Sequence, residues 1–216
     1  MGNIRIHSLE APELPELKYL ESHDSEVISL AYSSPVPSAK AQPTLDDIKQ
    51  GKPAPKKRFL LASGGRDKQV LLYDSESDYE AFMNLDHHTS TITALQFNEY
   101  STIKDTRMSG TPNYERHIDL YSSSADKNLI SKSVDLARFS LHRCDLPSAG
   151  LDMNDPLLKL SKTQICKDKI LSLDVAGQAQ YMITGHDKSL CLWKLPTFEK
   201  VWEKRVATME KENVNK

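Results

Sequence analysis

A repeated segment constrains the fold of this 216-residue chain more than any other feature. Each copy contains a short apolar run, a turn of small residues that ends in Asp-Lys, and a second run that alternates apolar and polar residues. The three copies occupy residues 60–75, 120–134 and 181–195, with Asp-Lys at Asp67-Lys68, Asp126-Lys127 and Asp187-Lys188. Alternation with a period of two residues is typical of β-strands, so each copy predicts two strands joined by a tight turn.

Another strand candidate precedes each copy, at residues 22–33, 87–98 and 166–177. His23, His88 and Cys166 lie four residues before Val27, Ile92 and Ile170, so the three lead-ins are in phase. Shorter candidates fall between the copies, at residues 17–20, 80–85, 138–143 or 158–165, and 198–204. We therefore expect a repeating unit of four short strands, with a partial copy at residues 2–9 that matches the second strand alone.

This unit resembles the WD40 repeat, whose four-stranded sheets form the blades of a β-propeller. In that family a His before the first strand, a Ser or Thr on the second, an Asp in the turn and a Trp ending the third form a hydrogen-bonded tetrad. In the first full unit, the resemblance assigns these roles to His23, Ser63, Asp67 and Tyr73. Asp74 follows in the position of the Asp that comes after the Trp.

The second unit offers His88, Ser122 and Asp126, but Lys132 stands in the aromatic position. A Ser-His-Asp combination could also be catalytic. A catalytic set must converge at one pocket, however, and it is not expected once in every repeat unit. The repetition therefore favours a structural role for these side chains.

The third unit offers Asp187 and Trp193. Cys166 replaces the His, Ile183 falls where the hydroxyl is expected, and Lys194 replaces the final Asp. We therefore expect the second and third tetrads to be incomplete.

The spacing of the units predicts how much of a propeller is present. A blade takes about 40 to 45 residues, whereas Val27 and Ile92 are 65 residues apart and Ile92 and Ile170 are 78 apart. The predicted fold is all-β, a partial WD40 β-propeller of about three and a half four-stranded blades. The expected divisions are a half blade of outer strands at residues 1–21, blades at 22–86, 87–165 and 166–206, and a polar tail at 207–216. Because closed propellers have about 4 to 8 blades, we expect the remaining blades to come from a longer chain or from self-association.

The excess length falls in three expected insertions, at residues 33–58, 98–117 and 144–159. The first is rich in Pro, Ala, Ser and Lys and is predicted to be disordered. Long loops on one face favour a partner-binding surface, although surface insertions are also tolerated at little cost. The basic run at residues 52–58 is either a nuclear-import signal or a cluster that keeps the next apolar strand soluble.

Composition excludes several classes of function. Lys and Arg number 28 against 30 Asp and Glu, a net charge of −2 that provides no field for nucleic acid or an anionic membrane. We expect no membrane segment and no lipid anchor. Cys144, Cys166 and Cys191 lack the spacing of a metal site and are expected to be buried thiols. No cofactor, metal or catalytic residue is predicted.

Residues 60–134 resemble more closely the scaffold family of mitogen-activated protein kinase-binding protein 1 and WD repeat-containing protein 62. The resemblance implies a non-enzymatic scaffold in the cytoplasm, at the cytoskeleton or at the centrosome, with kinases or spindle and centrosomal components as partners. Nuclear import is less expected. The alternative is a targeting propeller of a larger enzyme or nucleoprotein complex whose catalytic part lies outside this chain.

Overall fold

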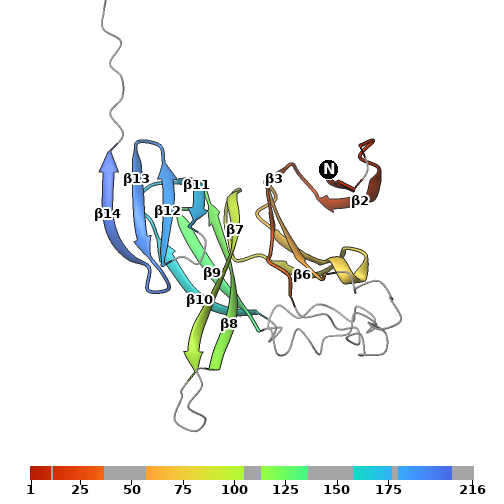
Figure 1. Cartoon of the computed structure of the whole chain (residues 1–216). Helices are drawn as coiled ribbons and strands as arrows, with labels where there is room; N and C mark the ends of the chain where they lie inside the picture. The colour runs from red at the N-terminus through yellow and green to blue at the C-terminus, as the bar shows by residue number, and fades with distance from the viewer. Residues whose placement is uncertain (11, 37–56, 105–112, 136–157, 177–179, 206–216) are drawn as a thin grey trace, which may run out of the picture.

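The chain folds into sheets that follow one another along the sequence (Figure 1). A computed structural model describes residues 1–10, 12–36, 57–104, 113–135, 158–176 and 180–205. Within these ranges there are one two-stranded sheet and three four-stranded sheets, and every pair of neighbouring strands is antiparallel. The all-β class and the partial propeller of about three and a half blades are thereby confirmed.

The strands of each sheet are consecutive in sequence. The two-stranded sheet contains β1 (Gly2–His7) and β2 (Glu16–His23). The first four-stranded sheet contains β3 (Val27–Tyr32), β4 (Leu60–Gly65), β5 (Val70–Asp74) and β6 (Glu80–Leu85), with the 3-10 helix η1 (Ser75–Ser77) between β5 and β6. The second contains β7 (Ile92–Lys104), β8 (Asn113–Ser124), β9 (Asn128–Val134) and β10 (Leu158–Ile165). The third contains β11 (Ile170–Val175), β12 (Tyr181–His186), β13 (Ser189–Lys194) and β14 (Glu199–Arg205).

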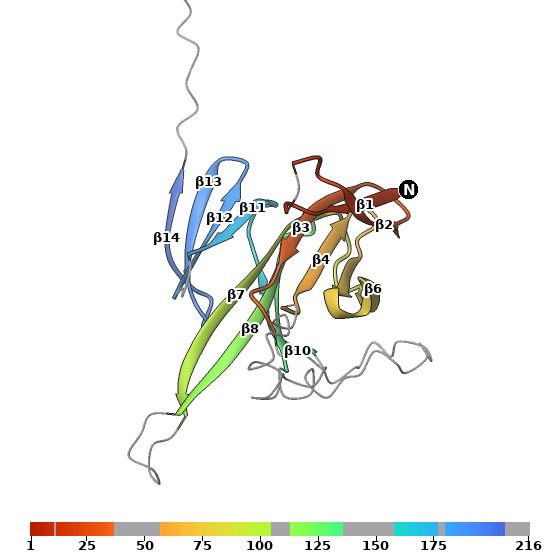
Figure 2. The same cartoon turned by 45° about the vertical axis from the view of Figure 1, so that its right-hand side comes forward.

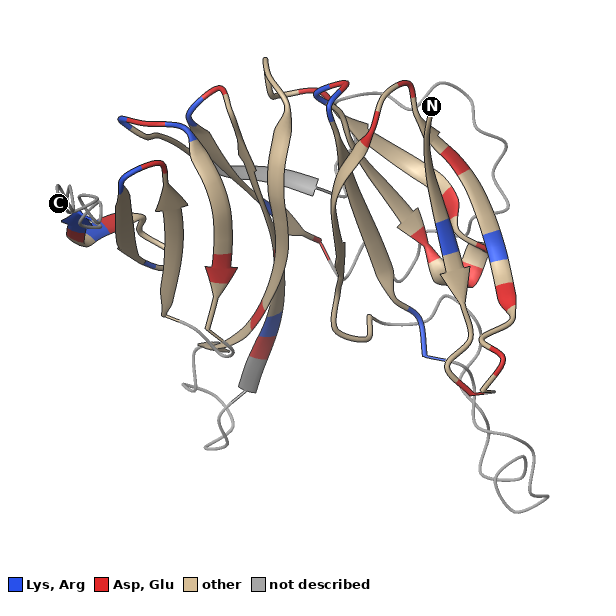
Figure 3. Ribbon diagram, turned by 90° about the horizontal axis from the view of Figure 1, so that it is seen from above, with Lys and Arg blue, Asp and Glu red and all other residues tan. Residues whose placement is uncertain are grey.

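Apolar side chains fill the spaces between neighbouring sheets. Alternating residues of one strand enter different cores: on β5, Leu72 joins the core with the second sheet, whereas Tyr73 packs with Ile4 and Ile6 of the two-stranded sheet. The core between the second and third sheets includes Trp193. Seen from above, the sheets stand side by side in chain order, with acidic and basic residues interspersed (Figure 3). A sheet buried on both faces is the packing that propeller blades require.

Gly64 allows the first and second sheets to approach closely. A Cβ atom at this position would lie 2.4 Å from Cγ2 of Ile92 at the start of β7. The side chain of Ser29 on β3 also accepts a hydrogen bond from the backbone N–H of Leu95 at 3.0 Å. A small residue and a polar contact therefore fix the spacing of these two sheets.

The expected insertion at residues 98–117 is largely a β-structure, so the prediction of a loop is wrong there. Strands β7 and β8 remain paired from Ala94 and Ser123 out to Lys104 and Asn113, while β9 pairs with β8 only as far as Ile118. We call residues 99–104 and 113–117, which extend beyond β9, the arm; it projects from the body of the sheets (Figure 2). Continuous pairing satisfies the backbone hydrogen bonds that an irregular loop would leave to water.

The expected disordered insertion at residues 33–58 is ordered at both ends. Val36 and Arg58 form an antiparallel bridge, and the Val36 N–H donates to the Arg58 carbonyl at 2.8 Å. Ser33 is hydrogen-bonded to Leu60 through both its backbone and its side chain. The prediction of disorder is therefore wrong for these two ends, because main-chain pairing continues after the end of β3 and begins before the start of β4. Residues 37–56 lie outside the described residues.

The third expected insertion, residues 144–159, ends inside a strand. Of the two candidates for the outer strand of the second sheet, the structure forms β10 at Leu158–Ile165. Residues 158–159 are therefore strand residues rather than part of a loop. The other candidate at 138–143, most of the insertion including Cys144, and the expected tail at 207–216 lie outside the described residues.

Candidate functional site

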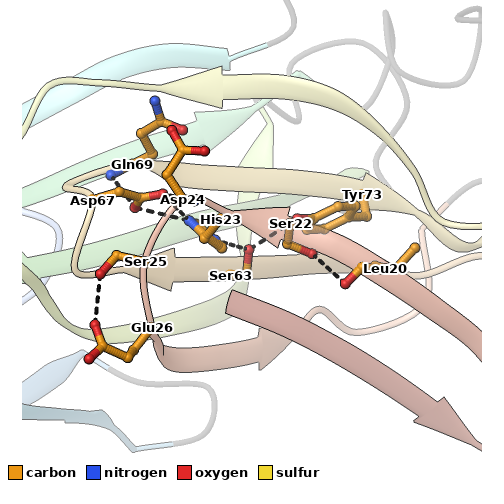
Figure 4. A network of polar contacts seen from close by, with 10 residues as sticks. All are labelled: Leu20, Ser22, His23, Asp24, Ser25, Glu26, Ser63, Asp67, Gln69 and Tyr73. Atoms are coloured by element: carbon orange, nitrogen blue, oxygen red, sulfur yellow. Dashed lines mark hydrogen bonds and ion pairs between the residues drawn. The ribbon is translucent and has the colours of Figure 1, made fainter. Parts of the chain in front are cut away.

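The first predicted tetrad forms one hydrogen-bonded chain at the edge of the first sheet (Figure 4). Nδ1 of His23 lies 2.9 Å from the Asp67 carboxylate, and Nε2 lies 2.7 Å from Oγ of Ser63. The carboxylate can only accept, so Nδ1 carries the proton, and in the neutral form of the ring Nε2 accepts from Ser63. The hydroxyls of Ser63 and Tyr73 are 3.3 Å apart, which places Tyr73 at the end of the chain.

Asp67 also fixes the backbone around it. It accepts the backbone N–H of Asp24 at 3.2 Å and that of Gln69 at 3.2 Å. The next residue, Lys68, has φ of 74°, the left-handed conformation of a tight turn. The carboxylate therefore joins the β4–β5 turn to the segment before β3.

The second network repeats this geometry. Nδ1 of His88 lies 3.1 Å from Asp126 and Nε2 lies 2.9 Å from Ser122. Asp126 accepts the backbone N–H of Thr89 and of Asn128, each at 2.8 Å. Burial lowers the pKa of His88, although Asp126 acts in the opposite direction. Burial alone would raise the pKa of Asp126, but the two N–H groups and His88 together lower it.

Lys132 occupies the aromatic position of the second unit and has a different partner. It is 6% exposed, and its Nζ lies 3.1 Å from Nε2 of His87. Burial lowers the pKa of Lys132, and burial together with the positive charge of Lys132 lowers the pKa of His87. A neutral imidazole accepts a hydrogen bond from the buried ammonium, so the residue in the aromatic position of this unit pairs with His87.

The third network uses a hydroxyl that the sequence reasoning missed. The expected position, Ile183, is 36% exposed, whereas Thr184 is fully buried and its Oγ1 accepts the Nε1–H of Trp193 at 2.8 Å. Thr184 pairs with Cys191 in the same register in which Ser63 pairs with Leu71. The turn after Thr184 is one residue shorter than the turn after Ser63. Counting back from Asp187 by the spacing of the first unit therefore selects Ile183, on the opposite face of the strand.

His186 connects this third turn to the segment before β11. Its Nδ1 lies 3.1 Å from the carbonyl oxygen of Lys169 and its Nε2 lies 3.0 Å from Oγ1 of Thr184. A carbonyl can only accept, so Nδ1 carries the proton and Nε2 of the neutral ring accepts from Thr184. Asp187, predicted as the tetrad carboxylate, is exposed, and no hydrogen bond joins it to Thr184 or His186 in this part of the structure. The assignment of Asp187 was therefore wrong.

Arg58 was expected in an exposed basic run and instead forms a buried ion pair. Arg58 and Asp74 are each 1% exposed, with Nη2 2.6 Å from Oδ2 and Nε 3.0 Å from Oδ1. Asp74 also accepts the backbone N–H of Glu76 at 3.0 Å, which caps η1. The last residue of the insertion is thus anchored to the Asp that follows the tetrad aromatic.

The cysteines of the third sheet are free and buried. Burial, and then the neighbouring Cys191, raises the pKa of Cys166 to about 11. Burial likewise raises the pKa of Cys191. Because the thiolate is the reactive form, these thiols are poor nucleophiles. Cys166, which stands at the position of the tetrad His in this unit, packs in the core between the second and third sheets.

The described ranges contain neither a candidate metal site nor a candidate membrane helix. No cluster of three or more His, Cys, Asp or Glu side chains there has the geometry to hold a metal ion. No helix in the same ranges has the length and apolar character to span a bilayer.

Comparison with known proteins connects these blades to named relatives. No family model matches the chain. It is 31% identical to mouse WD repeat-containing protein 62 over 141 residues, or 65% of this chain and 7% of that protein. It is 35% identical to mouse mitogen-activated protein kinase-binding protein 1 over 97 residues, or 45% of this chain and 5% of that protein. The chain thus corresponds to a small part of these relatives.

A solved structure supports the fold over nearly the whole chain. A chain in the crystal structure of the mitotic checkpoint complex superimposes with a TM-score of 0.55 at 16% identity. The match covers 94% of this chain and 46% of that one. This chain therefore has the fold of a set of β-propeller blades and is similar, over part of its length, to WD repeat-containing protein 62 and mitogen-activated protein kinase-binding protein 1.

Proposed function

We propose that this chain belongs to a non-enzymatic WD40 scaffold that mediates protein–protein interactions. The observation that carries the proposal is the use of the His side chains: His23, His88 and His186 each join a turn to the segment before an inner strand. Both ring nitrogens are engaged in these contacts, and the arrangement recurs from sheet to sheet instead of converging at one pocket, which favours a structural role over a catalytic one. The similarity to WD-repeat relatives supports the same reading.

Mitogen-activated kinase signalling is the first specific role that we propose. It is motivated by the name of mitogen-activated protein kinase-binding protein 1. The test is a titration of purified mitogen-activated protein kinases against the immobilised chain, with an unrelated WD40 propeller as the control surface. Saturable binding that the control lacks is expected. Equal binding to both surfaces would remove the kinase role.

Spindle or centrosome organisation is the second specific role. The structural neighbour is part of a mitotic complex, although its 16% identity supports the fold alone. We propose a cytoplasmic location, with attachment to the cytoskeleton or the centrosome. Fluorescent tagging of the full-length gene product in dividing cells tests this placement. Signal at spindle poles is expected, and uniform signal throughout mitosis would contradict it.

The outer face of the third sheet carries exposed apolar residues that a further blade or a second copy of the chain could cover. Ile183, Leu192 and Trp202 form one cross-strand row, and Trp202 remains 40% exposed. Exposed apolar rows of this kind are association surfaces. We propose that further blades of a longer chain or a second copy cover it. Light scattering tests self-association: a defined dimer supports a second copy, whereas aggregation supports missing blades of a longer chain.

The alternative function is a targeting propeller within a larger enzyme or nucleoprotein complex. The curated relatives are far longer than this chain, which leaves room for other domains in a full protein. The flanking coding sequence discriminates between the two functions. Additional repeats favour the scaffold, and a kinase, ligase or nuclease domain favours the targeting role.

A further inference from the structure

Lys132 carries an amine into the core between the first and second four-stranded sheets. It lies directly opposite Leu120 in the pairing of β9 with β8, and residues opposite one another share a face of the sheet. Leu120 and Val134, two residues further along β9, belong to that core. Lys132 is itself only 6% exposed. Its aliphatic stem therefore packs among apolar side chains.

An aromatic residue would suit this position better than a lysine. Lys132 lies two residues beyond the register partner of Ser122 on β9. Trp193 has the same relation to Thr184 in the third sheet, and it donates its indole N–H to the Thr184 hydroxyl. A tryptophan in place of Lys132 would thus have Ser122 as its acceptor, whereas an ammonium must lose hydrating water to occupy the site. An amine at a position that disfavours its charge points to a chemical role.

His87 gives this amine a base. Nζ of Lys132 lies 3.1 Å from Nε2 of His87, inside the range of about 2.6–3.2 Å that joins an activated nucleophile to its base. Within the described part of the chain, no carboxylate forms an ion pair with Lys132. His87 is exposed, so the end of the buried side chain lies next to solvent.

The pair of amine and imidazole occurs in one unit only. Tyr73 and Trp193 stand at the position of Lys132 in the other two units. The contacts of the tetrad histidines, in contrast, recur from sheet to sheet. Repetition favoured a structural role for those histidines, and its absence here removes that argument for Lys132 and His87.

The surrounding charges favour transfer of a proton from Lys132 to His87. Burial lowers the pKa of Lys132, which raises the fraction of neutral, nucleophilic amine. Burial, then Lys132 and to a smaller extent His88, lower the pKa of His87. The exposed carboxylate of Asp86 acts in the opposite direction on both groups. Once His87 has taken a proton, the same carboxylate stabilises the imidazolium.

The burial of Lys132 limits the size of an electrophile that can reach it. The amine is covered by His87 and by the apolar side chains around its stem. Carbon dioxide is a linear molecule of three atoms that reacts with neutral amines without an activating group. An acyl thioester is far larger and would require His87 to move aside.

We propose that Lys132 is a modification site at which the amine reacts reversibly with carbon dioxide to form a carbamate. Loss of one proton from the ammonium gives the neutral amine. Its lone pair then attacks the carbon of carbon dioxide, a C–N bond forms, one C=O π bond opens to give the carboxylate, and the N–H proton passes to Nε2 of His87. Neutral amine, carbon dioxide and imidazole thus become carbamate and imidazolium, with no other reactant. The inference goes beyond the proposed scaffold function and does not depend on it.

The test is trapping of carbamates on the whole chain with triethyloxonium ion, at constant neutral pH under ¹³C-labelled carbon dioxide. The reagent converts a carbamate into a stable ethyl ester, which mass spectrometry of the digested protein assigns to a residue. We expect label on Lys132 at several-fold higher occupancy than on Lys127, an exposed lysine of the same sheet that serves as the internal control. Degassing before trapping should remove the label, because the carbamate is reversible.

His87→Asn keeps a polar side chain and removes the base, so the label on Lys132 should fall to the level of Lys127. His7→Asn, in the two-stranded sheet, is the matched control and should leave the label unchanged. Lys132→Met should lose the label at that position and keep or raise the melting temperature, because it removes a buried amine from an apolar core.

Four outcomes overturn the inference. They are no label on Lys132, equal label on Lys132 and Lys127, equal label on Lys132 in wild type and His87→Asn, and a lower melting temperature in Lys132→Met, which would assign the amine a structural role. Acylation of Lys132 by an acetyl thioester without labelling by carbon dioxide would likewise contradict the assignment of the electrophile.

Discussion

Trp193 donates its indole N–H to Oγ1 of Thr184 at 2.8 Å, inside the core between the second and third sheets. Thr184→Val keeps the shape of the side chain but leaves the buried indole N–H unpaired. We expect the free energy of unfolding to fall by about 1–3 kcal/mol. Chemical denaturation measures the change.

Ile183→Val is the matched control for this substitution. Ile183 precedes Thr184 on β12 but is 36% exposed, so the loss of one methyl group should cost less than about 0.5 kcal/mol. A larger loss of stability for Ile183→Val than for Thr184→Val would support the sequence-based assignment to Ile183 and contradict the hydrogen bond between Trp193 and Thr184.

Arg58→Met should be among the most destabilising single changes in the first sheet. It leaves Asp74 buried without its bidentate partner, and breaking a buried pair in this way costs about 3–5 kcal/mol. Lys57→Met is the neighbouring exposed control and should change stability by less than about 0.5 kcal/mol. Equal melting temperatures for the two variants would show that the insertion end is not anchored in solution.

Acidification should destabilise the second network in two steps. The pKa of His88 is lower in the folded state, so the unfolded chain binds more protons and stability falls as pH drops below about 6.5, the unfolded value. The pKa of Asp126 is also lowered, so its contribution is lost as pH falls below about 4. His88→Asn should flatten the first step relative to the exposed control His7→Asn. Parallel profiles for the two variants would refute this prediction.

Two of the three Asp-Lys turns hold their Lys in a left-handed conformation. Lys127 has φ of 71°, a region in which a side chain costs about 1–2 kcal/mol, so Lys127→Gly should stabilise the protein by about 0.5–1 kcal/mol. Lys188, in the shorter third turn, does not have a positive φ. Lys188→Gly should therefore destabilise the protein by about 0.5–1 kcal/mol. Denaturation measures both changes in the free energy of unfolding. If both variants are stabilised, or both destabilised, the proposed difference in backbone conformation between the two turns is wrong.

The repeat pattern predicted the sheets because strand alternation and turn chemistry are local properties of the sequence. It failed at Thr184, because the turn there lacks one residue, and counting back from the Asp then assigns every earlier side chain to the wrong face of the strand. The shorter Gly185-to-Ser189 turn was the available signal. A comparison of strand registers, rather than of residue offsets, would have identified the hydroxyl.

The arm and the buried Arg58 were less accessible from sequence. Residues 98–104 carry no strict apolar alternation, so the sequence there shows no strand pattern. Arg58 closes a basic run, and its burial depends on Asp74, which lies 16 residues away. Long-range pairing of this kind leaves no local pattern to detect.

The protonation sites of the turn histidines test the account most directly. Long-range ¹H–¹⁵N correlation of the imidazole rings near neutral pH should show His23, His88 and His186 with the proton on Nδ1 and an unprotonated Nε2 that accepts from a hydroxyl. The three Nδ1–H signals should also exchange slowly with water. An Nε2-protonated ring or an averaged tautomer at any of the three positions would show that the networks do not lock these turns to the segments before the inner strands.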